Sequence, residues 1–514
     1  MKSILSLCFF LALTLLARCY NFASIFAGGQ IYFVDADCYS RMTRVRMVME
    51  HPFTIIRHHS FENYPQGIVS HATAPFDYLI AALAVLLKPF TANYLDLAGA
   101  IVSPVLAALI IVFLWLWVKK MQLPYGGMVL FLFAVSPILV HGTILGRPDH
   151  QSLQMLCVAV ALGAEWCFSQ KPSREWGIAS GAAWGLGLWT SLYEPAILLV
   201  ATVLLYVIFD RRKLWVPERK AGYLVLAGIL ALSLIIQGWP FSFPDQTLLK
   251  YFPRWEQTIG EMSSTTLLSP LLYRWVGFGL MASPVLFLLR CRVDKRVISI
   301  LFLVLLTCGL SLWQIRWGYF FGLVFVMSLP FQFVVFRKPW IGWGVFIVCL
   351  WPILKEWDEN LFPDDERRAQ LHEQWVDEIL LRDTAEHLKS TEQLPLLAPW
   401  WFAPALAYWS GQPAVAGSSH EGMAGIVDTA RFYLTNDPEE AQRILLAHGV
   451  KRVVTYDTGR VLQTSSTLLG QNAPAHSMAE TLDEYPHSAP DFLKFEYAHQ
   501  SNPAFKIFKV EINP

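Results

Sequence analysis

Long apolar runs, separated by short clusters of Lys and Arg, dominate this chain of 514 residues. Only 16% of the residues are charged, against about 25% in an ordinary soluble domain, so most of the chain suits lipid better than water. A helix needs about 20 apolar residues to cross the hydrocarbon core of a bilayer. The pattern predicts a polytopic α-helical membrane protein with about 11–13 transmembrane helices. The predicted spans are 4–27, 95–118, 123–142, 152–170, 176–192, 194–209, 221–238, 267–289, 297–313, 317–336 and 340–356.

The basic clusters indicate how these spans are oriented. Short loops rich in Lys and Arg remain in the cytoplasm. With Lys2 inside, alternation places every basic cluster on that side, and three acidic patches at 34–39, 146–151 and 258–261 on the other. The apolar stretch 76–90 contains Lys88-Pro89, and we interpret it as a re-entrant or interfacial helix. The cytoplasmic clusters are 119–120, 171–174, 211–213, 290–296 and 337–338.

A change of composition near residue 357 predicts a second domain. Charged residues become frequent there, and about 158 residues remain, enough for a separate core. The segment 439–448 has the pattern of an amphipathic helix, whereas 452–456 and 505–510 have the pattern of strands. We therefore expect a transmembrane domain at 1–356, with outer loops 28–94 and 239–266. An extracytoplasmic mixed α/β domain should follow at 357–514.

Carboxylates concentrate in the first two acidic patches. Asp35 and Asp37 lie in the first patch, and Asp149, His150 and Gln151 lie at the outer end of a predicted span. Oxygen donors in short loops suit a hard divalent cation such as Mg²⁺ or Mn²⁺. Two simpler interpretations stay open, namely a solvated turn for the first patch and a helix N-cap for Asp149. The zero formal net charge argues against a nucleic-acid partner.

Glu261 and Arg316 also fall on the predicted outer side. An Arg at a span boundary can bind a phosphate with two parallel hydrogen bonds, although it can equally extend along lipid to reach water. A single Glu in a loop is usually solvated. The functional interpretation of Glu261 and Arg316 therefore depends on the other patches.

Several short motifs, in a fixed order, resemble one known family. Together they are similar to the catalytic subunit of oligosaccharyltransferase in its single-subunit bacterial and archaeal forms, within the GT-C membrane glycosyltransferases. The resemblance covers nearly the whole chain. The motifs are Asp35-x5-Arg41-x2-Arg44, Tyr64-Pro65-x-Gly67, Gly146-x-x-Asp149-x-Gln151, Thr258-Ile259-Gly260-Glu261, Arg316 and Trp400-Trp401.

The resemblance implies a function and a set of site residues. A glycan would move from a polyprenyl-phosphate or -pyrophosphate donor to a peptide or glycan acceptor, beside membrane lipid, in the bacterial inner (plasma) membrane. The implied divalent cation, Mn²⁺ or Mg²⁺, would be held by Asp35 (or Asp37, depending on register) and Asp149, with Gln151 where the family often has an acid or His. Glu261 would contact the acceptor amide, and Arg316 the donor phosphate. The implied catalytic residues are Asp35, Asp37, Asp149 and Glu261.

The tail departs from the family pattern. The family has Trp-Trp-Asp, which reads the hydroxyl of an Asn-x-Ser/Thr acceptor, whereas this chain has Trp400-Trp401-Phe402. The two Trp residues are still expected to bind acceptor. Phe402 cannot accept a hydrogen bond, so we expect no selection for a hydroxyl there. Two alternatives remain, a transporter or flippase of lipid-linked or anionic solutes, and a non-catalytic relative.

Overall fold

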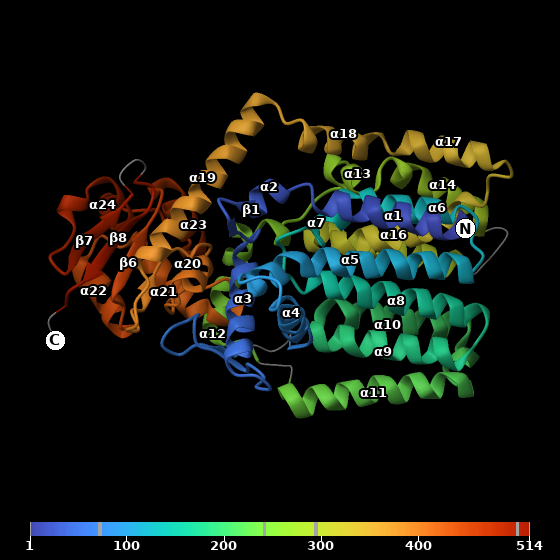
Figure 1. The fold of residues 1–514 in the computed structure, drawn as a ribbon, viewed down its shortest axis with the longest axis horizontal. Coiled ribbons are helices and arrows are strands. Elements are labelled where there is room, and N and C mark those ends of the chain that lie inside the picture. The colour runs from blue at the N-terminus through green and yellow to red at the C-terminus, as the bar shows by residue number, and fades with distance from the viewer. Residues whose placement is uncertain (1, 70–73, 240–242, 292–296, 500–502, 513–514) are drawn as a thin grey trace. The chain divides into compact units, whose positions relative to one another are not determined.

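The computed structural model describes residues 2–69, 74–239, 243–291, 297–499 and 503–512. The chain forms two compact units, which are described separately (Figure 1). Unit 1 contains Met1–Ile31, Ala72–Pro240 and Glu261–Asp364, and unit 2 contains Tyr32–His71, Phe241–Gly260 and Asp365–Pro514. Most of both outer loops therefore groups with the tail, whereas the sequence analysis assigned these loops to the transmembrane domain. The expected boundary at residue 356 stays a prediction.

Unit 1 is a helical bundle, and each predicted span contains one helix or a broken helix pair. Among the described residues, α5, α8 and α11 are each long and apolar enough to cross a bilayer, and α13–α14, bent by 70°, would make a fourth span. The helices are α1 (Lys2–Arg18), α4 (Ala74–Leu87), α5 (Tyr94–Lys120), α6 (Gly126–Val135), α7 (Pro137–His141), α8 (Gln151–Gln170), α9 (Arg174–Thr190), α10 (Tyr193–Phe209), α11 (Pro217–Gln237), α13 (Pro270–Val276), α14 (Gly279–Cys291), α15 (Val297–Trp313), α16 (Gly318–Phe333), α17 (Pro339–Cys349) and α18 (Trp351–Leu361).

The first predicted span, 4–27, is too long. Helix α1 ends at Arg18, and a hairpin of β1 (Phe26–Ala27) and β2 (Gln30–Ile31) follows the short helix α2 (Phe22–Ile25). Gly28 and Gly29 form the hairpin turn with φ of +57° and +74°, a conformation that suits glycine. Arg18, the last residue of this helix, is buried, and a buried charge needs hydrogen-bond partners. Its guanidinium donates to the carbonyl of Phe133 at 2.9 Å.

Glycine brings α9 and α11 into close contact. A Cβ added at Gly181 would collide with the backbone of Gly222, and one at Gly222 would collide with the backbone of Gly177. Small residues four positions apart let helix backbones approach closely in membranes. A buried ion pair also joins α11 to α8, because Arg219 of α11 donates two 2.9 Å hydrogen bonds to Glu165 of α8. Helix α9 is thereby held beside both neighbours.

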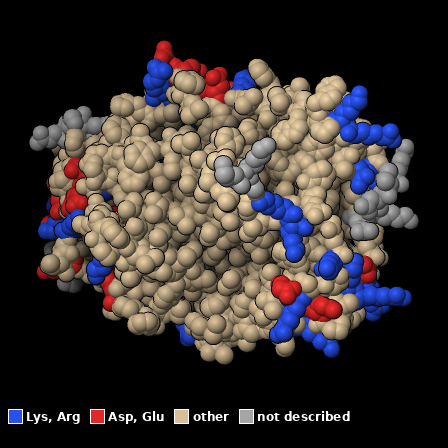
Figure 2. Space-filling view, turned by 45° about the vertical axis from the view of Figure 1, so that its right-hand side comes forward, with Lys and Arg blue, Asp and Glu red and all other residues tan. Residues whose placement is uncertain are grey.

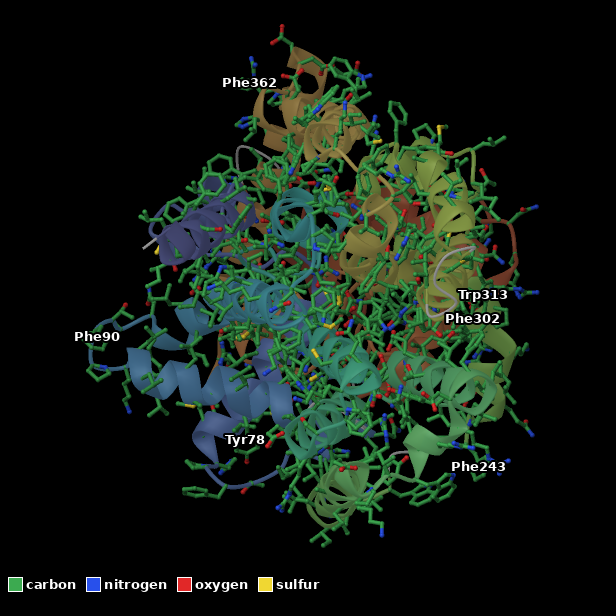
Figure 3. All side chains as sticks on the ribbon, turned by 90° about the vertical axis from the view of Figure 1, so that its right-hand side faces the viewer. Tyr78, Phe90, Phe243, Phe302, Trp313 and Phe362 are labelled. Atoms are coloured by element: carbon green, nitrogen blue, oxygen red, sulfur yellow. The ribbon has the colours of Figure 1, made fainter. Side chains whose placement is uncertain are left out.

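The outer surface of the bundle is apolar, as a lipid-facing surface should be. Figure 2 shows a wide face with few charged side chains and with Lys and Arg gathered on its right-hand side. In Figure 3, Phe302 and Trp313 of α15 point away from the bundle, and they are 42% and 56% exposed. Trp313 ends its helix, a position typical of interfacial aromatic residues.

Unit 2 contains the predicted mixed α/β fold. Its four-stranded sheet has the order β5-β6-β8-β7, with β5 and β6 parallel and the other pairs antiparallel. Strands β6 and β8 and helix α22 match the predicted strands and helix. The elements are α3 (Ala36–Glu50), β3 (His58–His59), β4 (Ile68–Val69), α12 (Gln246–Trp255), α19 (Asp365–His387), β5 (Leu396–Leu397), α20 (Ala403–Ser410), α21 (Met423–Leu434), α22 (Pro438–Ala447), β6 (Arg452–Thr455), α23 (Thr458–Leu469), α24 (Met478–Glu484), β7 (Leu493–Ala498) and β8 (Lys506–Val510).

Hydrogen bonds connect the first outer loop to the tail inside unit 2. The buried carboxylate of Glu62 accepts from the Ser40 hydroxyl and from the Ser419 amide. His448 bridges the carbonyl of Tyr64, 2.7 Å from Nδ1, and the carboxylate of Asp428, 3.0 Å from Nε2. Only a protonated imidazole can donate to both oxygens. The imidazole therefore couples this loop to the tail most strongly when it is charged.

This bridge predicts that unit 2 loses stability as the pH rises above neutrality. Burial alone would lower the pKa of His448, but Asp428 and the Tyr64 carbonyl raise it above the ordinary value of 6.5. The stabilisation is complete below the unfolded-state pKa and is lost as the pH rises through the higher folded-state pKa. In thermal unfolding of the purified full chain between about pH 5.5 and 8.5, His448→Gln should flatten this decline. His372→Gln, at an exposed position, is the control and should leave the decline unchanged. If stability falls with pH equally steeply in His448→Gln and in the unmutated protein, the prediction is wrong.

Candidate functional site

A tight loop before α8 positions the second acidic patch in unit 1. Gly146 has φ +78°, and its amide donates to the carbonyl of Ala100 at 2.8 Å. A Cβ at Gly146 would collide with Ile25, so glycine is needed for both its conformation and its packing. The residue in the N-cap position of α8 is His150, which makes no side-chain cap. The interpretation of Asp149 as the helix cap is therefore wrong.

Four residues of this region form what we call the polar cluster: Arg147, Asp149, Gln151 and Glu261. The guanidinium of Arg147 lies 2.7 Å from Glu261 and 3.6 Å from Asp149. Gln151 Nε2 donates to Glu261 at 3.4 Å. Three members, Arg147, Asp149 and Gln151, are buried. The predicted residues Asp149, Gln151 and Glu261 therefore share one site within unit 1.

Two further side chains support Glu261. The hydroxyl of Tyr319 donates to its carboxylate at 3.2 Å, and His141 Nδ1 lies 2.9 Å from the same hydroxyl. Burial raises the pKa of Glu261, but the nearby Arg147, Arg316 and His141 together outweigh burial, and the pKa is lowered. Glu261 is therefore ionised at neutral pH and can accept a hydrogen bond from a substrate N–H or O–H. It is not the fully solvated loop residue of the simpler interpretation.

Arg316 makes a specific ion pair. It lies in a 3-10 turn, Ile315–Trp317, between α15 and α16. Its Nη2 donates to Glu194 at 2.6 Å, and Glu194 is only 3% exposed. The guanidinium carbon also lies 5.9 Å from the centre of the Tyr193 ring. Arg316 Nε is buried and has no hydrogen-bond partner among the described residues.

The polar cluster provides oxygen donors of the kind that Mg²⁺ and Mn²⁺ prefer. The side-chain oxygen of Gln151 is buried without a hydrogen-bond partner in the part of the chain that the structure describes. Asp149 supplies a carboxylate beside it, and its Oδ1 lies 2.7 Å from His150 Nδ1. A search of the described residues finds no group of three or more His, Cys, Asp or Glu side chains arranged for a metal. The donors thus suit a cation, but this cluster alone does not complete a ligand set.

Asp35 and Asp37 belong to unit 2, not to the unit that contains the polar cluster. Asp35 is the N-cap of α3, because its carboxylate accepts from the amide of Cys38 at 3.0 Å. Asp37 lies exposed in the first turn of the same helix. These two acids are two positions apart in the chain, and their role as cation ligands stays a prediction.

Trp400 and Trp401 line a small cavity in unit 2, together with Ile426, Thr429 and Ser465. The Nε1 atoms of both Trp residues are buried and have no partner among the residues described. The Phe402 ring packs against Trp401, with 5.7 Å between ring centres, and against Tyr456 at 4.7 Å and Phe505 at 5.3 Å. The side chain at position 402 therefore contributes to an aromatic core.

The sequence analysis missed four residues of this region. Arg147 stands in a quoted motif but received no role, and Glu194, His141 and Tyr319 were not considered. Glu194 had a usable signal, because an acid inside an apolar span is costly and needs a partner. No spacing rule could have paired it with Arg316, which is 122 positions further along the chain.

Comparison with known proteins places this geometry in context. A model of the dolichyl-phosphate-mannose-protein mannosyltransferase family matches residues 73–239. The dolichyl-phosphooligosaccharide-protein glycotransferase 1 of Archaeoglobus fulgidus is 27% identical over 139 residues. That match covers 27% of this chain and 23% of the relative.

Solved structures extend the similarity to the whole fold. The Archaeoglobus fulgidus oligosaccharyltransferase in complex with Zn and sulfate has a TM-score of 0.67 at 13% identity, covering 96% of this chain and 79% of that one. Archaeal oligosaccharyltransferase AglB from the same organism, in complex with an inhibitory peptide and a dolichol-phosphate, has a TM-score of 0.68 at 13% identity, covering 97% and 79%. The chain thus has the polytopic GT-C fold of an archaeal oligosaccharyltransferase, as its motifs predict.

Proposed function

We propose that this chain is a metal-dependent glycosyltransferase. It would transfer a sugar or oligosaccharide from a polyprenyl-phosphate or -pyrophosphate donor to an extracytoplasmic acceptor. The observation that carries the proposal is the polar cluster, with the Arg316–Glu194 pair, at the end of the bundle opposite the basic clusters. The placement of this chain in a bacterial inner membrane, with the cluster outside, is part of the same proposal.

Arg316 would hold the phosphate of the donor. A guanidinium is a strong, directional partner for phosphate, and the crystallised AglB is described with a dolichol-phosphate. Glu194 would act as a positioning residue, because its buried carboxylate holds Nη2 of the guanidinium at 2.6 Å. When the bond between the anomeric carbon and the phosphate oxygen breaks, its electron pair would stay on that oxygen, and the guanidinium would stabilise the resulting anion.

Glu261 and the cation ligands would orient the acceptor. Asp149, Gln151 and Asp35 or Asp37 would hold a divalent cation, Mn²⁺ or Mg²⁺, and the related oligosaccharyltransferase was crystallised with Zn. When bound, the cation would offset the charge of the phosphate. The ionised Glu261 would accept a hydrogen bond from the acceptor N–H or O–H. This hydrogen bond would direct the lone pair of the acceptor nitrogen or oxygen at the anomeric carbon.

Asp149→Ala should lower transfer by more than about 100-fold, because it removes a cation ligand at the reacting centre. The assay is transfer from a polyprenyl-linked glycan by the purified protein, with and without a chelator and added Mn²⁺ or Mg²⁺. Asp210→Ala, at the other end of the bundle, is the matched control. Full activity of Asp149→Ala, at normal abundance and thermal stability, would contradict the assignment. Asp35→Asn and Asp37→Asn, tested separately, identify the second ligand, and we expect Asp35 to matter more.

Arg316→Ala should raise KM for the lipid donor by about 10-fold or more and leave KM for the acceptor nearly unchanged. Glu194→Gln should shift the donor KM in the same direction by a smaller factor, and Arg316→Lys should restore part of the loss. The double variant should be no worse than Arg316→Ala alone, because Glu194 acts through Arg316. Equal effects on both KM values would instead indicate a structural role at the membrane interface.

The acceptor should not be selected through a hydroxyl two places after the modified residue. A site built to bind a hydroxyl rejects a substrate that lacks it by about 10⁴-fold or more. Phe402 offers no acceptor atom, and its ring packs against Trp401, Tyr456 and Phe505. We expect rates with Asn-x-Thr and Asn-x-Val peptides to agree within about 10-fold, or a glycan to be the acceptor. A transfer rate that depends strongly on the Thr hydroxyl would show that the cavity beside the two Trp residues binds this hydroxyl without help from residue 402.

A further inference from the structure

A second cavity lies at the basic end of unit 1, which we define as the helix ends near residues 119–121, 169–174, 209–217 and 337–339. Its volume is about 600 Å³, within the usual range for a small-molecule site. Residues of α8, α10, α15 and α16 line it. On α8, the lining residue Glu165 lies 14 positions from Gln151, or about 21 Å along the helix. The cavity is therefore separate from the polar cluster.

Apolar side chains make up much of the lining of this cavity, and polar side chains such as Thr202 and Ser299 share it. Leu162, Leu205, Ile300 and Leu303 are all buried lining residues, and Phe209 stands at the edge, 48% exposed. Two acids line the cavity: Glu165 accepts two hydrogen bonds from Arg219 and one from the Ser180 hydroxyl, and Asp210 pairs with Lys213. The apolar part of the lining therefore suits a flexible hydrocarbon chain, and both acids of the described lining are already paired.

The rim of the cavity carries positive charge. Lys213 donates to the carbonyl of Ser169 and pairs with Asp210, both at 2.6 Å, and its ammonium has a third N–H. The neighbouring Arg211 and Arg212 are exposed. Basic pockets between transmembrane helices suit the headgroups of anionic lipids.

We infer that this cavity binds one anionic membrane phospholipid, with an acyl chain between α10 and α15 and its phosphate at Lys213. The inference is independent of the proposed transferase activity, whose phosphate site lies at the other end of the bundle. The proposed phospholipid site differs from the proposed donor site in the lipid headgroup, in the end of the bundle that it occupies and in the residues that form it.

The test is native mass spectrometry of the purified full chain in a non-ionic detergent, titrated with dioleoylphosphatidylglycerol or dioleoylphosphatidylcholine. We expect one tightly retained phosphatidylglycerol and at least tenfold weaker binding of phosphatidylcholine. Leu303→Trp, which fills the cavity, should weaken phosphatidylglycerol binding at least tenfold. Leu305→Trp, on the exposed side of the same helix, should have no effect. Lys213→Ala should remove most of the headgroup preference, whereas Lys171→Ala, outside the lining, should retain it.

Three outcomes would overturn the inference. The first is unchanged phosphatidylglycerol binding in Leu303→Trp. The second is equal binding of the two phospholipids by the unmutated protein. The third is displacement of phosphatidylglycerol by equimolar undecaprenyl phosphate, which would assign the cavity to the tail of a polyprenyl lipid. If Leu303→Trp does not fold, as judged by its unfolding midpoint, Ile300→Phe replaces it, and Lys213→Ala still tests the headgroup contact.

Discussion

Unit 1 depends on the high cost of burying a charged side chain away from water. Its buried charges meet this cost with close partners. Arg18 donates to backbone carbonyls, Glu165 pairs with Arg219, and Glu194 pairs with Arg316. Each partner comes from a distant part of the sequence, so the pairs fix which helices are neighbours. Apolar packing selects helix neighbours less strongly, because an apolar side chain finds equally apolar surroundings among the lipid tails.

The same constraint separates structural charges from charges that can act on a ligand. The carboxylate of Glu165 is saturated by Arg219 and Ser180, and it sits deep in the bundle. At the opposite end, the Gln151 oxygen and Arg316 Nε have no hydrogen-bond partner among the described residues. A buried polar atom without a partner is costly unless something binds to it. The proposed substrate site rests on these atoms of the polar cluster and the neighbouring ion pair.

Hydropathy was sufficient to predict the helices, because a bilayer requires every backbone polar group inside it to be satisfied within the segment. The eleven predicted spans contain helices for this reason. Hydropathy could not predict the end of α1 at Arg18 or the bend between α13 and α14, since both arise from local turns and side-chain contacts. The grouping of residues 32–71 with the tail was also beyond reach. It depends on hydrogen bonds such as that between His448 and Tyr64, which join residues 384 positions apart.

Prediction of the site was uneven for a related reason. Asp149, Gln151 and Glu261 were found because polar residues stand out in apolar sequence, and the structure places them together in unit 1. Arg147 and Glu194 were missed because each matters through the charged residue that it pairs with, Glu261 and Arg316 respectively. Such pairing is a property of three-dimensional proximity, and a single sequence does not contain it.

Helix α11 shows how few positions such an arrangement constrains strongly. Only 6% of its most apolar 18-residue window is buried, and its close contacts include Gly222 and Arg219. At the exposed positions of a lipid-facing helix, one apolar residue can replace another at little cost. A helix of this kind can therefore keep its place while most of its sequence changes. The same fold at 13% identity, with a TM-score of 0.67, is compatible with this tolerance.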